Sequence, residues 1–218
     1  MIKHELVTVA VIMAGGQGSR MELGHSKVFM KLNGEFLLEH SIRQLMVTKV
    51  DKIYILSDKD SYNGCVKISS RFQGVDIEIC KDKKDNYEST FLILKDFLAA
   101  NCSFDNILFT YGHAPRPTSY YDKLLNLYNT FILATEVSRS TKRNVVIREN
   151  SHCIEPPYII NVDLIQNSEA EDWKSFFNEN MENNYSNYFL IAPNEFNFIE
   201  ELDDYLKYII NGYPEGDM

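Results

Sequence analysis

The chain has 218 residues, of which 44% are hydrophobic and 24% charged, and its formal net charge at pH 7 is −9. These values fit one globular domain with a sizeable core, and the acidic balance argues against a general nucleic-acid-binding protein. No apolar stretch is long enough to span a membrane. The four cysteines form no Cys-x-x-Cys pair, so we expect reduced thiols and no zinc site. The composition therefore predicts a single cytoplasmic domain over residues 1–218.

The first predicted element is a buried strand that ends in glycines. Residues 7–14 are almost continuously apolar, as in a strand covered on both faces of a parallel sheet. Gly15 and Gly16 follow directly, and Gly18 lies two residues further on. Glycines at the end of a strand allow backbone N–H groups to approach a ligand closely. This stretch therefore predicts a loop that binds an anionic ligand.

Two positively charged residues follow the glycines and indicate which anion the loop binds. Arg20 and Lys27 lie within reach of the loop and can neutralise phosphate oxygens, although Lys27 could also be a surface lysine beside a helix. A P-loop is excluded because the required Gly-Lys-Ser or Gly-Lys-Thr is missing. The Rossmann dinucleotide fingerprint is excluded because Met21 stands where the third glycine belongs. The order of strand, glycines, arginine and lysine predicts another kind of nucleotide phosphate site.

Strands and helices alternate through the middle of the chain. The periodicity predicts helices over residues 36–47, 89–100 and 121–128, and strands over residues 52–57, 75–80 and 106–111. Because the β-then-α order recurs, we expect a three-layer, doubly wound, mostly parallel α/β sheet. The strand over 106–111 delivers Gly112 and His113 to its carboxyl end, where open α/β sheets bind ligands. Asp58 and Asp60 also follow a strand, but aspartates are common in turns and are not assigned to the site.

The second half of the chain has weaker patterns. The expected elements are a strand pair over 130–137 and 145–148, a strand over 158–164, helices over 172–180 and 200–210, a solvated loop over 178–187, and a frayed tail over 212–218. Pro156 and Pro157 are expected to break the chain before the strand over 158–164. Neither an internal repeat nor a linker divides the chain.

The glycine loop and the residues after it resemble the sugar-phosphate nucleotidyltransferases. The resemblance rests on Ala14-Gly-Gly-Gln-Gly-Ser-Arg-Met21, Ser26-Lys27-Val28 and Lys31-Leu-Asn-Gly34. It is strongest to the uridylyltransferase domain of N-acetylglucosamine-1-phosphate uridylyltransferases, in which a proline usually stands at the position of Ser26. The resemblance implies a nucleotide-diphospho-sugar transferase-like fold, which is Rossmann-like in its layers.

The same resemblance assigns roles to the loop residues, because in that family the loop wraps the phosphates of the nucleotide. It implies that the nucleotide is bound by Ala14, Gly15, Gly16, Gly18 and Ser19. It also implies that Arg20 and Lys27 are catalytic and neutralise charge as pyrophosphate leaves.

Two further segments resemble the metal-binding motifs of the family. Residues 107–118 resemble Tyr-Gly-Asp-x-Pro, with Tyr111, Gly112 and Pro115 matching and His113 in place of the metal-binding aspartate. Near the C-terminus, Asn197 matches the asparagine that is the second metal ligand, and its alternative role is helix capping. The resemblance implies that Tyr111 and Gly112 contact the nucleotide and that His113 and Asn197 hold Mg²⁺. Because imidazole is a poor magnesium ligand, Mn²⁺ or Co²⁺ is an alternative.

The implied reaction is transfer of a nucleoside monophosphate from a nucleoside triphosphate, with UTP expected, to a sugar-1-phosphate or related phosphate. Pyrophosphate is released, and positioning with charge neutralisation suffices without a protein nucleophile. The segments that contact uracil and the sugar in the family are altered here, at residues 81–88 and 142–144, so base and acceptor stay open. These changes and His113 keep a second function open, a nucleotide-binding protein that has lost turnover. The missing third glycine disfavours a dinucleotide-dependent oxidoreductase, and we expect no acetyltransferase β-helix domain and no membrane or nucleic-acid partner.

Overall fold

A computed structural model describes residues 7–16, 24–82, 89–101, 103–116, 118–127, 132–137, 153–182 and 187–191. Several sequence-based expectations lie outside these residues, namely those for Gly18, Ser19, Arg20, Asn197, the strand over 145–148, the helix over 200–210 and the tail over 212–218.

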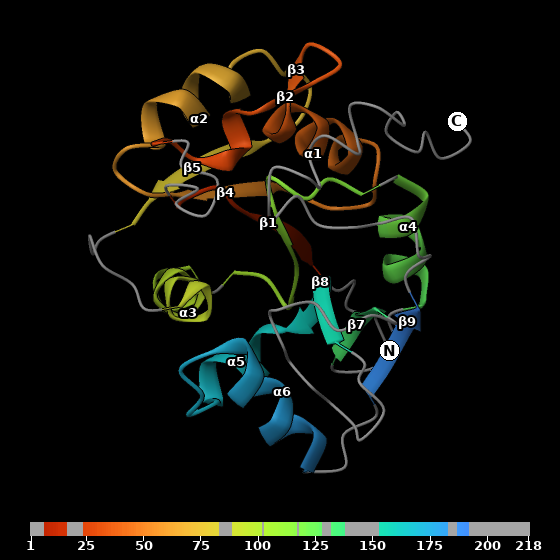
Figure 1. Cartoon of the computed structure of the whole chain (residues 1–218). Helices are drawn as coiled ribbons and strands as arrows, with labels where there is room; N and C mark the ends of the chain where they lie inside the picture. The colour runs from red at the N-terminus through yellow and green to blue at the C-terminus, as the bar shows by residue number, and fades with distance from the viewer. Residues whose placement is uncertain are drawn as a thin grey trace.

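The described residues form one large sheet, a short hairpin and helices on both faces of the sheet (Figure 1). The strands are β1 (Thr8–Met13), β2 (Lys31–Leu32), β3 (Glu35–Phe36), β4 (Ile53–Ser57), β5 (Ile77–Lys81), β6 (Asn106–Tyr111), β7 (Ile132–Val137), β8 (Cys153–Asn161) and β9 (Asn187–Ile191). The helices are the 3₁₀ turn η2 (Lys27–Phe29) and α1 (Leu37–Met46), α2 (Tyr62–Ser69), α3 (Thr90–Ala100), α4 (Thr118–Leu127), α5 (Val162–Asn167) and α6 (Trp173–Glu182).

The large sheet is mixed but mostly parallel. Its strand order within the described residues is β5-β4-β1-β6-β8-β7-β9, and β2 pairs only with β3. Only β8 runs antiparallel to its neighbours β6 and β7, whereas the other pairs in this sheet are parallel. The carboxyl ends of β1, β4, β5 and β6 therefore meet at one edge of the sheet.

Side chains of β1 alternate between two cores and create the three layers. Val9, Val11 and Met13 pack on the face covered by α3, α5 and α6. Ala10 and Ile12 point to the opposite face, where α1, α2 and α4 pack. All of these strand residues are at most 3% exposed. The expected three-layer, doubly wound α/β fold is confirmed, and β1 is buried on both faces because helices pack on each face.

One local expectation about strands is wrong. Pro156 and Pro157 lie inside β8 instead of breaking the chain. The register of β7 and β8 shifts at this point, since Tyr158 pairs with Ala134 while Glu155 pairs with the next residue of β7. Pro156 and Pro157 fall at this register shift, and an irregularity of this kind accommodates residues that have no backbone N–H.

The helix boundaries differ from the sequence pattern in three places. Residues 162–164, expected as strand, begin α5, because the Asn161 side chain caps this helix by accepting a hydrogen bond from the Asp163 N–H at 3.0 Å. Helix α6 continues to Glu182, into the stretch expected as loop. Helix α2 was not expected, since it is short and contains Gly64, which lowers helix propensity.

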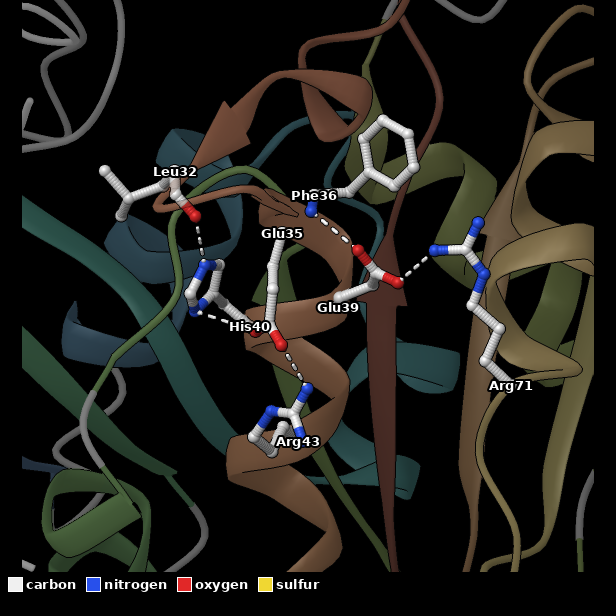
Figure 2. Close-up of polar contacts among 7 residues, drawn as sticks. All are labelled: Leu32, Glu35, Phe36, Glu39, His40, Arg43 and Arg71. Atoms are coloured by element: carbon white, nitrogen blue, oxygen red, sulfur yellow. Dashed lines mark hydrogen bonds and ion pairs between the residues drawn. The ribbon is translucent and has the colours of Figure 1, made fainter.

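Polar contacts fix the β2–β3 hairpin to the helices behind it, as Figure 2 shows. One oxygen of Glu39 accepts the Phe36 N–H at 2.7 Å and caps the first turn of α1, while the other oxygen binds Arg71 at the end of α2. The ring of His40 contacts the Leu32 carbonyl oxygen at 2.9 Å. Burial raises the pKa of Glu39, but the Phe36 N–H and the Arg71 guanidinium lower it overall. This ionised cluster holds the hairpin, and with it the preceding η2 turn, against α1.

Candidate functional site

The glycine loop leaves the carboxyl end of β1 alongside β4. The Ala14 N–H donates to the carbonyl oxygen of Leu56 in β4 at 2.8 Å, so the loop starts as a continuation of the sheet. Gly16 then has a φ of +101°, which L residues with a side chain rarely adopt. Gly15 is needed for another reason, since a methyl group there would lie 3.2 Å from the backbone nitrogen of Asp58. A side chain at Gly16 would therefore strain the backbone, and one at Gly15 would crowd Asp58.

Lys27 belongs to a segment that is tied directly to this loop. The hydroxyl of Ser26 donates to the Ala14 carbonyl oxygen at 2.9 Å, and both groups are buried. A proline at this position could not make that bond. Lys27 follows as the first residue of η2 and is 7% exposed. The structure thus brings the segment of Lys27 against the Ala14–Gly16 loop, as the sequence predicts.

The turn after β6 lies beside the same loop. Met13 of β1 and Tyr111 of β6 are paired in register, and the Gly112 N–H donates to the Met13 carbonyl oxygen at 2.9 Å. The Ser41 hydroxyl of α1 donates to the Gly112 carbonyl oxygen at 3.2 Å and fixes the turn from the other face. The turn after β6 therefore begins beside the end of β1, two residues before the glycine loop starts.

His113 is half-buried, and its ring is stacked on Tyr111. The ring centroids are 5.4 Å apart, with an angle of 23° between the planes. The Tyr111 hydroxyl lies 3.1 Å from the hydroxyl of Thr90, the first residue of α3. The indole N–H of Trp173 also donates to Thr90 at 3.1 Å. These contacts link the orientation of His113 to α3 and α6.

Only one of the two predicted metal ligands, His113, lies among the described residues. No three His, Cys, Asp or Glu side chains come together as a metal-binding group in the part of the chain that the structure describes. Magnesium requires oxygen ligands, and His113 offers an imidazole nitrogen. Metal binding by His113 and by Asn197, which is outside the described residues, stays a prediction.

Asp58 is a site residue that the sequence analysis set aside. Its Oδ2 accepts the Gly16 N–H at 2.6 Å, while its Oδ1 accepts the Ser61 N–H at 2.7 Å and the Ser61 hydroxyl at 2.6 Å. Burial alone raises the pKa of Asp58, but these hydrogen bonds lower it below its usual value. The carboxylate is therefore ionised at neutral pH. The overlooked signal was its position directly after β4, the neighbour of β1.

Asp82 is a second acid at the same edge. Its backbone N–H donates to the Ser57 carbonyl oxygen of β4 at 2.9 Å. Burial, and then the charge of Asp58, raise the pKa of Asp82 to about 7. A cavity of about 290 Å³ extends from this residue between β5 and α3, and its lining includes Cys80, Ile93 and Phe97. The Asp82 carboxyl can therefore donate as well as accept a hydrogen bond near neutral pH.

Charged residues of both signs stand at the carboxyl edge. Asp58 and Asp82 directly follow β4 and β5, and the exposed Lys81 is the last residue of β5, whereas Lys27 and Arg116 come after β1 and β6 in sequence. Arg116 and Lys27 are 1% and 7% exposed, so both positive charges are nearly shielded from solvent. Coulomb attraction favours an anionic group of a ligand near these cations. The acids suit hydrogen-bond donors such as hydroxyl or amino groups.

Residues 10–173 match the MobA-like NTP transferase domain family. The chain belongs to this family. The expected similarity to sugar-phosphate nucleotidyltransferases is confirmed, since the relatives of this chain include both cytidylyltransferases and GlmU proteins.

Three relatives illustrate the range of proteins to which the chain is similar. The 2-C-methyl-D-erythritol 4-phosphate cytidylyltransferase of Thermosipho africanus is 27% identical over 175 residues, 78% of this chain and 76% of the relative. The bifunctional ribulose 5-phosphate reductase/CDP-ribitol pyrophosphorylase Bcs1 of Haemophilus influenzae is 37% identical over 93 residues, 40% of this chain and 20% of the relative. The bifunctional protein GlmU of Buchnera aphidicola is 31% identical over 115 residues, 53% of this chain and 23% of the relative.

Solved structures with a similar fold align with almost the whole length of this chain. A putative glucose-1-phosphate thymidylyltransferase from Bacillus anthracis has a TM-score of 0.78 at 12% identity and covers 97% of this chain and 98% of its own. The 4-diphosphocytidyl-2C-methyl-D-erythritol synthase of Anaerococcus prevotii has a TM-score of 0.72 at 17% identity, covering 94% and 96%. Within the described residues, no helix combines the length and apolar character needed to cross a membrane.

Proposed function

We propose that this protein transfers a nucleoside monophosphate from a nucleoside triphosphate to a phosphorylated sugar or sugar alcohol and releases pyrophosphate. A phosphate oxygen of the acceptor would attack the α-phosphorus, and the bond from that phosphorus to the pyrophosphate oxygen would break. The observation that carries the proposal is the junction of the Ala14–Gly16 loop, the Lys27 segment and the Gly112–His113 turn at one sheet edge. Lys27 would stabilise the negative charge that develops on the leaving pyrophosphate.

For the nucleotide, we propose CTP ahead of the UTP that the sequence resemblance suggested. The Thermosipho relative, which aligns with 78% of this chain, is a cytidylyltransferase, and the Haemophilus relative makes CDP-ribitol. Both relatives also support a phosphorylated sugar alcohol as acceptor ahead of a sugar-1-phosphate. The acids Asp58 and Asp82 are compatible with a base that carries an exocyclic amino group, such as cytosine.

The direct test measures pyrophosphate release from CTP, UTP, ATP and GTP with three acceptors. These are 2-C-methyl-D-erythritol 4-phosphate, ribitol 5-phosphate and N-acetylglucosamine-1-phosphate, each with magnesium and with manganese. We expect CTP with a sugar alcohol phosphate to give the highest kcat/KM. Replacing Lys27 with Ala should lower kcat/KM by about 10- to 100-fold, because a charged hydrogen bond to phosphate is lost. Lys31→Ala is the matched control, since Lys31 lies in the same segment but is exposed.

The possible outcomes separate the candidate functions. Wild-type protein that binds no nucleotide in calorimetry would contradict the proposal. Tight nucleotide binding without turnover would instead identify a nucleotide-binding protein that has lost its activity. A His113→Asp variant addresses the metal prediction, because a carboxylate at this position should raise activity with magnesium relative to manganese if residue 113 faces the metal.

A further inference from the structure

We propose that Asp58 is a positioning residue of the nucleotide site, which orients the glycine loop by holding the backbone N–H of Gly16. This inference rests on the proposed function and adds a residue that is far from the loop in sequence, at a separation of 42 residues.

The two oxygens of the Asp58 carboxylate make different contacts. Oδ1 accepts the N–H and the hydroxyl of Ser61, at 2.7 and 2.6 Å, and the Asp58 carbonyl oxygen accepts the Tyr62 N–H at 3.1 Å. These bonds fix the carboxylate on the turn that begins α2. Oδ2 is then directed at Gly16, whose N–H it accepts at 2.6 Å. The loop is thereby attached to the rigid unit formed by β4 and α2.

Two further contacts hold the loop in the three residues before the rest of the glycine motif. A methyl group at Gly15 would lie 3.3 Å from Oδ2 of Asp58, so the loop backbone packs against the carboxylate. The Ser26 hydroxyl holds the Ala14 carbonyl oxygen at 2.9 Å. The peptide of Gly16 therefore has a fixed orientation, and that peptide sets the direction in which the chain enters the remainder of the motif.

The charge of Asp58 also limits how a triphosphate can bind. The carboxylate is ionised at neutral pH, since its hydrogen bonds lower its pKa despite burial. The Gly16 N–H is already donated to it and is not a phosphate ligand. Repulsion between the carboxylate and phosphate disfavours any placement of the triphosphate in contact with Asp58. Asp58 thus orients the Gly16 peptide and repels the phosphates, without contacting them.

Three variants separate this role from simple stabilisation of α2. Asp58→Asn keeps the shape of the side chain, but its NH₂ end cannot accept, so either Gly16 or Ser61 loses an acceptor. Ser61→Ala removes one donor to Oδ1 and leaves the Gly16 contact in place. Asp60→Asn is the charge-matched control, because Asp60 is an exposed acid two residues away.

The measurements are the Kd of CTP and UTP by calorimetry, KM and kcat, melting temperature and the amide ¹H shift of Gly16. We expect Asp58→Asn to raise the Kd and KM about tenfold and to move the Gly16 amide resonance upfield. Ser61→Ala removes one of the two donors to Oδ1 and should raise Kd less than Asp58→Asn does, whereas Asp60→Asn should change Kd less than about twofold. Gly15→Ala perturbs the same contact without changing charge, so its effect on Kd should not add to that of Asp58→Asn.

The positioning role is wrong if Asp58→Asn changes nucleotide affinity no more than Asp60→Asn does. It is also wrong if the Gly16 resonance is unmoved in Asp58→Asn, or if Ser61→Ala weakens binding equally. A wild-type protein that binds neither CTP nor UTP would contradict the proposed function, and this inference with it. Wild-type binding together with an unaffected Asp58→Asn variant would contradict the positioning role alone.

Discussion

Replacing Asp82 with asparagine should stabilise the protein at pH 8 and change its stability little near pH 4. The folded state raises the pKa of this carboxyl from 3.8 to about 7, by burial and by the charge of Asp58. Below about pH 4 the group is protonated in both the folded and the unfolded chain. Between these values the unfolded chain loses its proton first, so the free energy of unfolding decreases as the pH rises. Above about pH 7 the Asp82 carboxyl is ionised in both states, and the full destabilisation of the folded state remains.

The size of the effect follows from the pKa difference. A rise from 3.8 to about 7 is about three units, and one unit corresponds to about 1.4 kcal/mol, which gives an upper limit of about 4 kcal/mol. Asp82 is only half-buried, so solvent screening reduces the expected gain to about 1–2 kcal/mol at pH 8. Asparagine retains the backbone N–H that donates to the Ser57 carbonyl oxygen, so the strand ends stay connected.

Urea unfolding at pH 4.5, 6 and 8 measures this effect. Trp173 is the single tryptophan and is buried, so its fluorescence reports unfolding at micromolar concentration. Asp60→Asn is the control for the general benefit of removing one negative charge from an acidic protein. Equal stabilisation by Asp82→Asn at pH 4.5 and pH 8 would refute the reasoning, as would an equal gain from Asp60→Asn. In an Asp58→Asn background the gain at pH 8 should shrink, because the charge that raises the pKa of Asp82 is gone.

Three further predictions concern the supports of the site. Ser26→Ala should lower the free energy of unfolding by about 1 kcal/mol and raise KM for the nucleotide, and an unchanged KM would contradict the link between this hydroxyl and the loop. Gly112→Ala should lower the free energy of unfolding by about 1–3 kcal/mol in urea, because the new methyl would lie 3.0–3.2 Å from three core side chains. An unchanged stability would contradict this and show that these side chains can move aside. Glu39→Ala removes a helix cap and should lower the free energy of unfolding by about 1–2 kcal/mol in the same measurement. Glu35→Ala removes an exposed ion pair with Arg43 and should lower it by less than about 1 kcal/mol. Equal losses in the two variants would contradict the role of the cap.

Features with a local signature were predictable from the sequence. The run over β1 is apolar at every core position because both faces are covered, and its end is marked by glycines. The adjacency of the glycine loop and the Gly112–His113 turn followed from parallel pairing of strands that share one carboxyl edge. The resemblance to nucleotidyltransferases depended on these same segments, so fold and family were predicted together.

Features that depend on distant contacts were not predictable. The role of Asp58 arises from a hydrogen bond to Gly16 across 42 residues, and a turn aspartate by itself is common. The passage of β8 through two prolines requires the register shift in β7, which no local pattern of β8 encodes. The pKa of Asp82 depends on burial and on a neighbouring charge, so its residue type suggested nothing unusual.

The central place of β1 also has a consequence for how the chain folds during synthesis. One edge of β1 pairs with β4, and the contact from the Thr8 N–H to Asp51 spans 43 residues. The other edge pairs with β6, and the contact from the Val7 N–H to Asp105 spans 98 residues. At about 5–20 residues per second, a ribosome supplies β6 roughly 5–20 s after β1. During that interval an apolar strand has an open edge to which other chains can pair, so nascent chains that end before β6 should aggregate or require a chaperone.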